Sequence, residues 1–217
     1  MRNILLGNSI VRGMESTCWE TIVLPGLGWQ GIASWIIDHV PRLQNSVVYI
    51  HVGPLSFSRR QFSNSMRQYV LDPAPHDVRE IFSVCLNAIS PHSIYLVFCT
   101  AHPMSFVDYN ASLTMGRLSL RRRSEYRAYD RDVIPLVVEA NQFITAFNRD
   151  QDMATPFLHR QILTRRRGRY SFRHQFLSDG LHPTRATTRE WVAILQRIVR
   201  MNNSAAARRQ QQVHVRF

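Results

Sequence analysis

Two short motifs near opposite ends of the chain carry the residue types of nucleophilic acyl transfer. The apolar run Ile4-Leu5-Leu6 of a strand predicted at 2–6 breaks into a Gly-Asn-Ser turn, which puts the Ser9 hydroxyl just beyond that strand. Asp179 and His182 stand three residues apart in the last fifth of the chain. In this chemistry a serine hydroxyl attacks a carbonyl, an imidazole takes its proton, and a carboxylate fixes the tautomer of the imidazole. We therefore predict Ser9, His182 and Asp179 as nucleophile, general base and orienting carboxylate.

Each motif also has a purely structural interpretation. Gly-Asn-Ser is ordinary turn composition, so Ser9 could serve the turn alone. Asp179 and Gly180 form a favoured pair at a turn that enters a helix. The catalytic interpretation depends on the two motifs acting together.

The motifs, in this order, resemble the sequence blocks of the SGNH (GDSL-type) serine hydrolases. Residues 7–10, Gly-Asn-Ser-Ile, are similar to the first block, with Asn in place of its usual Asp, and residues 179–182 match the last block, Asp-x-x-His. Residues 23–26, Val-Leu-Pro-Gly, look like the second block, and residues 48–53 look like the strand before the third. The SGNH domains of retrotransposons and related mobile elements are the most similar. The resemblance covers roughly residues 2–60 and 170–200, and it implies a serine esterase.

The resemblance also implies the parts of an oxyanion hole, one of which is missing. The backbone N–H groups of Ser9 and Gly26 would hold the developing negative charge. The third block normally continues Gly-x-Asn-Asp, and its Asn side chain is the third donor. Here Gly53 is followed by Pro-Leu-Ser, so Leu55 occupies the Asn position and cannot donate a hydrogen bond. Loss of one such donor typically costs about 10²–10³ in turnover. Three nearby residues are candidate replacements: His51, Ser56 and Ser58.

The positive charge of the chain is confined to one half and is carried by arginine alone. The chain has 27 arginines and no lysine, and its net charge is +12. Residues 1–116 hold seven arginines and seven acidic residues, whereas residues 117–217 hold twenty and eight. Arginine binds phosphate through a planar fork, and a field of this sign attracts polyanions. Codon bias is an alternative reason for the absence of lysine, but it does not produce the asymmetry.

Clusters of arginine with interleaved aromatic residues predict nucleic-acid binding as a second function. Arginine and aromatic side chains together suit single strands, because bases stack and phosphates pair. The alternatives are a solvated basic surface, a phospholipid surface or an acidic protein partner. The alternative to an esterase is therefore an inactive SGNH-like domain that binds RNA or DNA, or assembles a mobile element or virus. The predicted nucleic-acid contacts are Arg121, Arg122, Arg123, Arg165, Arg166, Arg167 and Arg169.

Hydrophobic periodicity predicts strands that alternate with helices, and hence an α/β fold: a three-layer α/β/α sandwich with a mostly parallel sheet. In such folds, sites lie beyond the carboxyl ends of the strands, where Ser9, Gly26 and Gly53 fall. We expect one SGNH-like domain over residues 1–201, with an Arg-rich insertion at about 104–131, and a disordered basic tail at 202–217. The predicted strands are 2–6, 21–24, 47–52, 93–99 and 156–163, and the predicted helices are 30–43, 63–69, 78–89, 133–148 and 184–200. Residues 165–169 are expected to form a basic loop.

Composition limits the remaining possibilities. No stretch approaches the ~20 apolar residues of a membrane span, and the first predicted strand begins without a signal peptide. The three cysteines, Cys18, Cys85 and Cys99, show no metal-ligand spacing and predict reduced thiols in an intracellular protein, cytoplasmic or nuclear. Cys99 is an alternative nucleophile. His51 and His102 are predicted to be structural. A serine mechanism needs neither a cofactor nor a metal, and no pattern indicates an oligomeric state.

Overall fold

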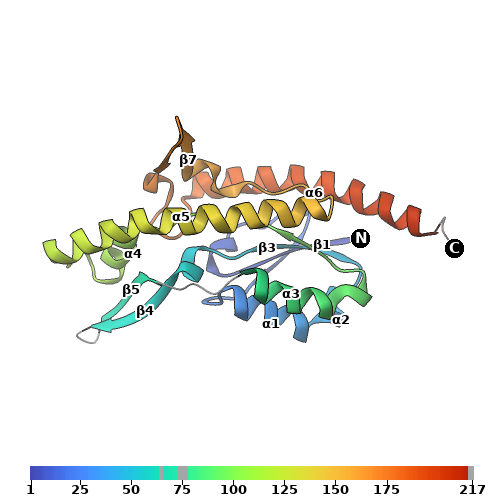
Figure 1. The fold of residues 1–217 in the computed structure, drawn as a ribbon, viewed down its shortest axis with the longest axis horizontal. Helices are drawn as coiled ribbons and strands as arrows, with labels where there is room; N and C mark the ends of the chain where they lie inside the picture. The colour runs from blue at the N-terminus through green and yellow to red at the C-terminus, as the bar shows by residue number, and fades with distance from the viewer. Residues whose placement is uncertain (64–65, 73–77, 215–217) are drawn as a thin grey trace.

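A parallel sheet of four strands forms the centre of the molecule in the computed structural model, which describes residues 1–63, 66–72 and 78–214 (Figure 1). The strands are β1 (Arg2–Gly7), β2 (Glu20–Val23), β3 (Ser46–His51) and β6 (Tyr95–Phe98), in the order β2-β1-β3-β6. All three neighbouring pairs are parallel, and Gly7 lies opposite His51. The centres of β1 and β3, residues 4–6 and 47–50, are hydrophobic and fully buried because helices cover both faces of the sheet.

Two layers of helices enclose the sheet, as the sequence predicts (Figure 1). One layer holds α1 (Trp29–Asp38), α2 (Val40–Leu43) and α3 (Val78–Ile89), and the other holds α5 (Leu120–Asp150) and α6 (Arg185–His214). Two hydrophobic clusters fill the space on either side of the strands, one packed largely by α1 and α3 and the other by α5 and α6. The predicted three-layer α/β/α sandwich is confirmed.

Two antiparallel hairpins lie outside the main sheet and replace predicted elements. The predicted helix at 63–69 is wrong, because β4 (Ser58–Ser63) and β5 (Met66–Leu71) pair with each other. The predicted basic loop at 165–169 is instead the turn of a hairpin formed by β7 (Leu163–Arg166) and β8 (Arg169–Phe172). A predicted fifth strand at 156–163 is also wrong, since the segment forms the 3-10 turn η4 (Leu158–Gln161).

Helices replace the segment expected to be irregular. Within 104–131 the chain forms α4 (Phe106–Leu113) and the first three turns of α5. The side chains of Ser105 and Ser119 are the N-caps of these two helices, because each accepts a hydrogen bond from the backbone N–H three residues later. Whether this segment is an insertion stays a prediction. The tail, expected to be disordered, continues α6 as far as His214, and residues 215–217 lie outside the described residues. Ala, Arg and Gln are good helix formers, so a helix already nucleated can extend through them.

Buried asparagine side chains, rather than a further strand, close one edge of the main sheet. Asn148 of α5 accepts from the backbone N–H of Phe98 and donates to its carbonyl, at 3.0 and 2.8 Å. Asn141, two turns earlier, does the same at Ala101, at 2.8 Å for both bonds. Each amide thus takes the place of a neighbouring strand, and the backbone groups of Phe98 at the end of β6 and of Ala101 just past it stay paired although buried.

Candidate active site

The first of the predicted site residues, Ser9, begins the 3-10 turn η1 (Ser9–Val11) directly after β1. Asn8 caps this turn, because its side-chain oxygen accepts from the Ile10 backbone N–H at 3.1 Å. The ends of β1 and β3 approach so closely that a Cβ on Gly7 would lie 2.3 Å from the His51 carbonyl oxygen. Glycine is therefore required at the position that turns the chain toward Ser9.

The structure brings Ser9, His182 and Asp179 into one hydrogen-bonded row. Ser9 Oγ lies 3.1 Å from His182 Nε2, and His182 Nδ1 lies 2.8 Å from Asp179 Oδ2. The second carboxylate oxygen, Oδ1, accepts from the backbone N–H groups of Leu181 and His182 at 2.9 and 2.8 Å. Because an ionised carboxylate can only accept, His182 Nδ1 must carry the proton, and Nε2 is left free to accept from Ser9. The side chains of His182 and Asp179 are about one third exposed, so the row is open to solvent.

The hydrogen bonds around Asp179 keep its carboxylate ionised. Its partial burial alone would raise the pKa, but the hydrogen bonds from the His182 ring and from two backbone N–H groups outweigh burial. The pKa of Asp179 is therefore lowered. The negative charge opposite Nδ1 is the arrangement that stabilises an imidazolium when His182 takes up a proton.

The loop that carries Asp179 and His182 is docked on the N-terminus of α4. Gly180 has a φ of +85°, and a Cβ there would lie 2.6 Å from the Tyr109 backbone nitrogen. The Ser105 backbone N–H donates to the Gly180 carbonyl at 2.7 Å. Only glycine fits this contact, both for its backbone conformation and for the space available.

A carboxylate of α5 in turn holds the start of α4. Asp130 Oδ1 accepts from the Phe106 backbone N–H at 2.5 Å, and Oδ2 accepts from the Ser105 hydroxyl at 3.2 Å. Burial raises the pKa of Asp130 to about 6 even though both hydrogen bonds favour its charged form. The row from Asp130 through Ser105 to Gly180 connects a residue of α5 to the loop of His182.

Within the described residues, the backbone N–H groups expected to form the oxyanion hole have no protein acceptor. Gly26 follows β2 with a φ of +77°. Among residues 1–63, 66–72 and 78–214, neither Ser9 nor Gly26 uses its backbone N–H in a hydrogen bond. Leu55 lies on the 3-10 turn η2 (Pro54–Phe57), and its side chain lies outside the described part of the chain. The Ser56 hydroxyl is buried without a partner in that part, 3.4 Å from where a Cβ on Gly28 would lie.

Two histidines near the site are fully buried and are unsuited to proton transfer. Burial lowers the pKa of His51 to about 3 and that of His102 to about 4, so both rings are neutral. They pack with Trp191, their ring centroids 5.2 and 5.3 Å from the indole. Among the described residues, both nitrogens of His51 lack a hydrogen-bond partner. Cys99 is also fully buried, and its raised pKa makes it a poor nucleophile.

The predicted nucleic-acid contacts fall in two separate places. Arg121, Arg122 and Arg123 lie in the first turn of α5, where Arg122 pairs with Glu125 at 3.1 Å. The other four lie within the β7–β8 hairpin and its turn, and this hairpin stands over the middle of α5 in Figure 1. The structure does not join the two clusters.

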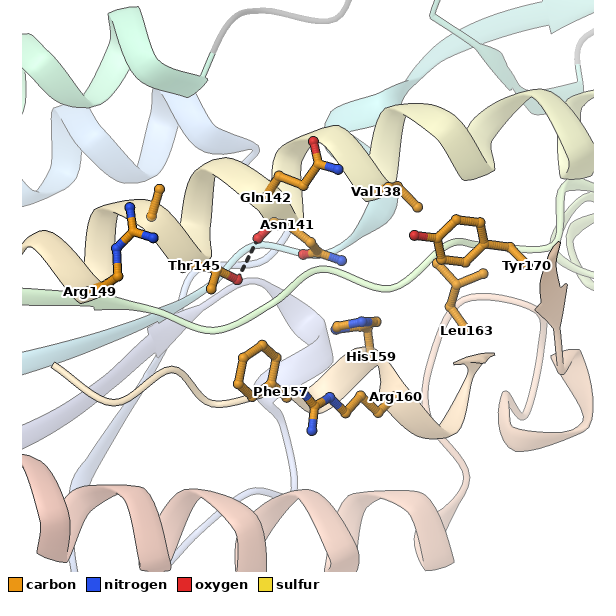
Figure 2. A pocket seen from close by; sticks show the side chains of 11 residues that line it. Val138, Asn141, Gln142, Thr145, Arg149, Phe157, His159, Arg160, Leu163 and Tyr170 are labelled. Atoms are coloured by element: carbon orange, nitrogen blue, oxygen red, sulfur yellow. Dashed lines mark hydrogen bonds between the residues drawn. The ribbon is translucent and has the colours of Figure 1, made fainter. Parts of the chain in front are cut away.

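A groove of about 360 Å³ lies between α5 and the segment that leads into the β7–β8 hairpin, as Figure 2 shows. Its basic residues are Arg149 and Arg160, and its aromatic rings are those of Phe157, His159 and Tyr170. The Arg160 guanidinium lies 3.9 Å from the centroid of the Phe157 ring, and Arg165 lies 5.6 Å from that of Tyr170. Tyr170 also lines two neighbouring cavities, so it stands at the centre of this surface.

Within the described ranges, no three His, Cys, Asp or Glu residues gather in a way that could hold a metal ion. None of the helices, as far as the structure describes them, combines the length and the apolar character needed to cross a membrane.

Comparison with solved structures identifies the architecture. A proposed acylhydrolase from Bacteroides fragilis matches at a TM-score of 0.62 and 13% identity, over 93% of this chain and 87% of that chain. A GDSL-like lipase from Bacteroides thetaiotaomicron matches at 0.61 and 13%, over 93% and 88%. The chain has the SGNH-hydrolase fold. The OSK domain of Drosophila Oskar shares the architecture at a TM-score of 0.53 and 9% identity, over 88% and 85%. No protein-family model and no curated protein matches the sequence.

Three residues near the site of this SGNH-hydrolase fold were not predicted from the sequence. Asp130 and Tyr109 lie in the segment that looked irregular, and Arg60 lies in the misassigned hairpin β4–β5. Tyr109 stands beside the row, its ring centroid 6.5 Å from that of His182. The sequence offers no signal for Arg60, because residues 59–61 are all polar and show no strand-like alternation.

Proposed function

We propose that this chain is a serine esterase that hydrolyses acyl esters at Ser9. The observation that carries the proposal is the row of hydrogen bonds from Ser9 Oγ to His182 Nε2 and from His182 Nδ1 to Asp179, at 3.1 and 2.8 Å. A serine used only for a turn has no need of an imidazole with a fixed tautomer and a carboxylate behind it. The SGNH-hydrolase fold supports the proposal.

In the proposed reaction, Ser9 Oγ bonds to the ester carbonyl carbon while its proton passes to His182 Nε2. The carbonyl oxygen becomes an oxyanion, and the free backbone N–H groups of Ser9 and Gly26 are the donors for it. The imidazolium, stabilised by Asp179, then gives its proton to the leaving alcohol, and an acyl-serine remains. Water repeats the sequence on the acyl-serine and releases the carboxylic acid.

Labelling with a fluorophosphonate probe tests this proposal. The parent chain should become labelled and should hydrolyse 4-nitrophenyl acetate, and Ser9→Ala should do neither. Ser204→Ala is the matched control, because Ser204 is exposed on α6 and donates only to the Arg200 carbonyl. Equal hydrolysis by parent and Ser9→Ala would show that the assignment of Ser9 is wrong.

The groove beside the β7–β8 hairpin favours a second candidate function, the binding of single-stranded nucleic acid. Arginine side chains lie over or beside aromatic rings at Phe157 and Tyr170, and the hairpin adds Arg166, Arg167 and Arg169 at its exposed turn. Such a surface pairs with phosphates and stacks with bases. Because it lies against the middle of α5 and not against Ser9, it is compatible with esterase activity. The similarity to mobile-element domains stays a prediction from the motifs.

A further inference from the structure

A single arginine of the β4–β5 hairpin lies beside the proposed oxyanion hole. One terminal nitrogen of Arg60 is 3.4 Å from the position that a Cβ on Gly26 would occupy. Since a Cβ would be bonded to the Cα that carries the Gly26 N–H, the guanidinium stands within a few ångströms of that proposed donor. Gly26 has no side chain in the way, so the space between Arg60 and the backbone of residue 26 is open.

Arg60 also faces the other side of the site. Its charge lowers the pKa of Tyr109, although burial, Tyr69 and Asp179 together raise that pKa to about 12. The Tyr109 ring adjoins that of His182, with 6.5 Å between centroids. Arg60 is therefore close both to Gly26 and to the tyrosine beside the general base, and the Ser9 hydroxyl lies against that same base.

The hairpin that carries Arg60 is fixed to the body of the molecule. Arg60 lies opposite Tyr69 in the β4–β5 ladder. The buried Asn110 of α4 accepts from the Tyr69 backbone N–H and donates to its carbonyl, both at 2.7 Å. Next to it, the Tyr126 hydroxyl of α5 donates to the Gln68 side chain at 2.7 Å. The backbone opposite Arg60 is thus held by two helices, which limits the positions that the guanidinium can adopt.

Arg60 has no ion-pair partner in the part of the chain that the structure describes. No acidic side chain in residues 1–63, 66–72 and 78–214 forms an ion pair with Arg60, whereas other arginines such as Arg42 and Arg122 have carboxylate partners. Arg60 is an exposed cation on a backbone fixed by two helices, and it lies next to a free N–H donor. Such a cation is well placed to bind a negatively charged group of a ligand.

We propose that Arg60 is a catalytic residue that completes the oxyanion hole with a charged side-chain donor. This inference rests on the proposed esterase function. When Ser9 Oγ adds to the ester carbonyl, the C=O π electron pair moves to the oxygen. The guanidinium then donates a hydrogen bond to that oxygen beside the N–H groups of Ser9 and Gly26. Arg60 acts only as a hydrogen-bond donor in this step, and no proton is transferred from it.

The test compares the steady-state kinetics of 4-nitrophenyl acetate hydrolysis. Arg60→Ala should lower kcat by about 10²-fold with little change in KM, because the donor acts on charge that appears only in the transition state. Arg60→Lys should recover part of the loss, since it restores a cation without the planar fork. Arg59→Ala is the matched control: Arg59 is the exposed neighbour whose side chain points to the opposite face of the strand, and its kcat should equal that of the parent.

A second substitution distinguishes two causes of a lower kcat in Arg60→Ala: the loss of a hydrogen-bond donor and the distortion of the β4–β5 hairpin. In Arg60→Ala combined with Leu55→Asn, the new amide should raise kcat at least tenfold above that of Arg60→Ala, because it supplies a neutral donor at the position where the sequence lacks one. A distorted hairpin would not be repaired in this way. Recovery supports the assignment, and no recovery overturns it.

The remaining outcomes separate this inference from the proposed function. If the fluorophosphonate labels Ser9 in the parent while Arg60→Ala keeps the parent kcat, or changes KM alone, the role of Arg60 is overturned and the esterase stands. A parent that is neither labelled nor active contradicts both.

Discussion

At the scale of single residues, the site depends on Asp179 accepting three hydrogen bonds at once. Two come from the backbone of its own loop and one from the imidazole, so the carboxylate orients the loop and the ring together. The lowered pKa of Asp179 means that its interactions stabilise the folded chain above the unfolded pKa of about 3.9, and that this contribution is lost as the pH falls through the folded value.

Asp179→Asn should separate the charge from the hydrogen bonds. An amide can still accept from the two backbone N–H groups, but its NH₂ group would face Nδ1 and favour the wrong tautomer of His182. We expect kcat to fall by about 10⁴-fold while the chain stays folded, as in other Ser-His-Asp sites. Ester hydrolysis and circular dichroism measure the two effects. Activity within tenfold of the parent would contradict the orienting role.

At the scale of elements, α4 is the platform on which the His182 loop rests, and α5 holds that platform through Asp130. Neither helix was recognised over this stretch, because α4 has only eight residues and the start of α5 is rich in arginine. The main contacts of α4 are non-local. Its residue Asn110 accepts a hydrogen bond from Tyr69 of the β4–β5 hairpin, 41 positions earlier in the chain. Local patterns cannot report such contacts.

Asp130→Ala should lower esterase turnover without touching the reacting groups. It removes the acceptors of the Phe106 N–H and the Ser105 hydroxyl, so the start of α4 and the Gly180 contact lose their support. We expect kcat to fall about tenfold or more, in line with the sensitivity of catalysis to small displacements. Asp130→Asn keeps one acceptor oxygen and should recover most of the kcat that Asp130→Ala loses. Equal rates for parent and Asp130→Ala would show that α4 is held by other contacts.

The raised pKa of Asp130 predicts that the stability of the parent chain and that of Asp130→Asn depend differently on pH. Between the ordinary carboxyl value of about 4 and its folded value of about 6, the folded state binds more protons than the unfolded state. Asp130 therefore contributes stability that rises as the pH falls through this window, and Asp130→Asn should lack that contribution. Urea unfolding of both chains at pH 4, 5, 6 and 7 measures the difference. Parallel stability curves would contradict the shift.

The sequence predicted the sheet well, for a physical reason. The central residues of strands β1 and β3, 4–6 and 47–50, form unbroken hydrophobic runs because both faces of the sheet are buried, and this pattern is local. The two chain ends that meet at the site carry recognisable motifs, so the Ser9, Asp179 and His182 candidates could be chosen from the residues. Arg60 could not, because its position depends on the Asn110 contact and on an open space at Gly26.

At the scale of the whole molecule, the basic half of the chain forms α5, the hairpin β7–β8 and α6, and the fold gathers only some of its arginines around aromatic rings. The first turn of α5 has arginines without such a groove, and one of them is paired with Glu125. The two clusters therefore form a matched pair for testing the second candidate function.

A labelled single-stranded RNA of about twelve uridines should bind in a salt-dependent way. Replacing the four arginines 165, 166, 167 and 169 by glutamine should weaken binding and reduce the salt slope by about 0.7 for each phosphate that is no longer neutralised. Tyr170→Ala should weaken binding about 5- to 150-fold because it removes base stacking, and glutamine at 121–123 should change little. Fluorescence anisotropy across salt concentrations measures these effects. Affinity that is independent of salt would contradict phosphate binding.

The turn between α4 and α5 has a consequence for how the site is assembled. Met115 and Leu120 are 90% and 87% exposed, and a Cβ on Gly116 would touch nothing within 4 Å. A break in the backbone here would leave Ser9 and Gly26 on a neutral fragment and Asp179 and His182 on a strongly basic one. Each fragment alone would hold an incomplete site. If the two fragments reassociated, Ser9 would again lie beside His182, held there only by non-covalent packing between the fragments.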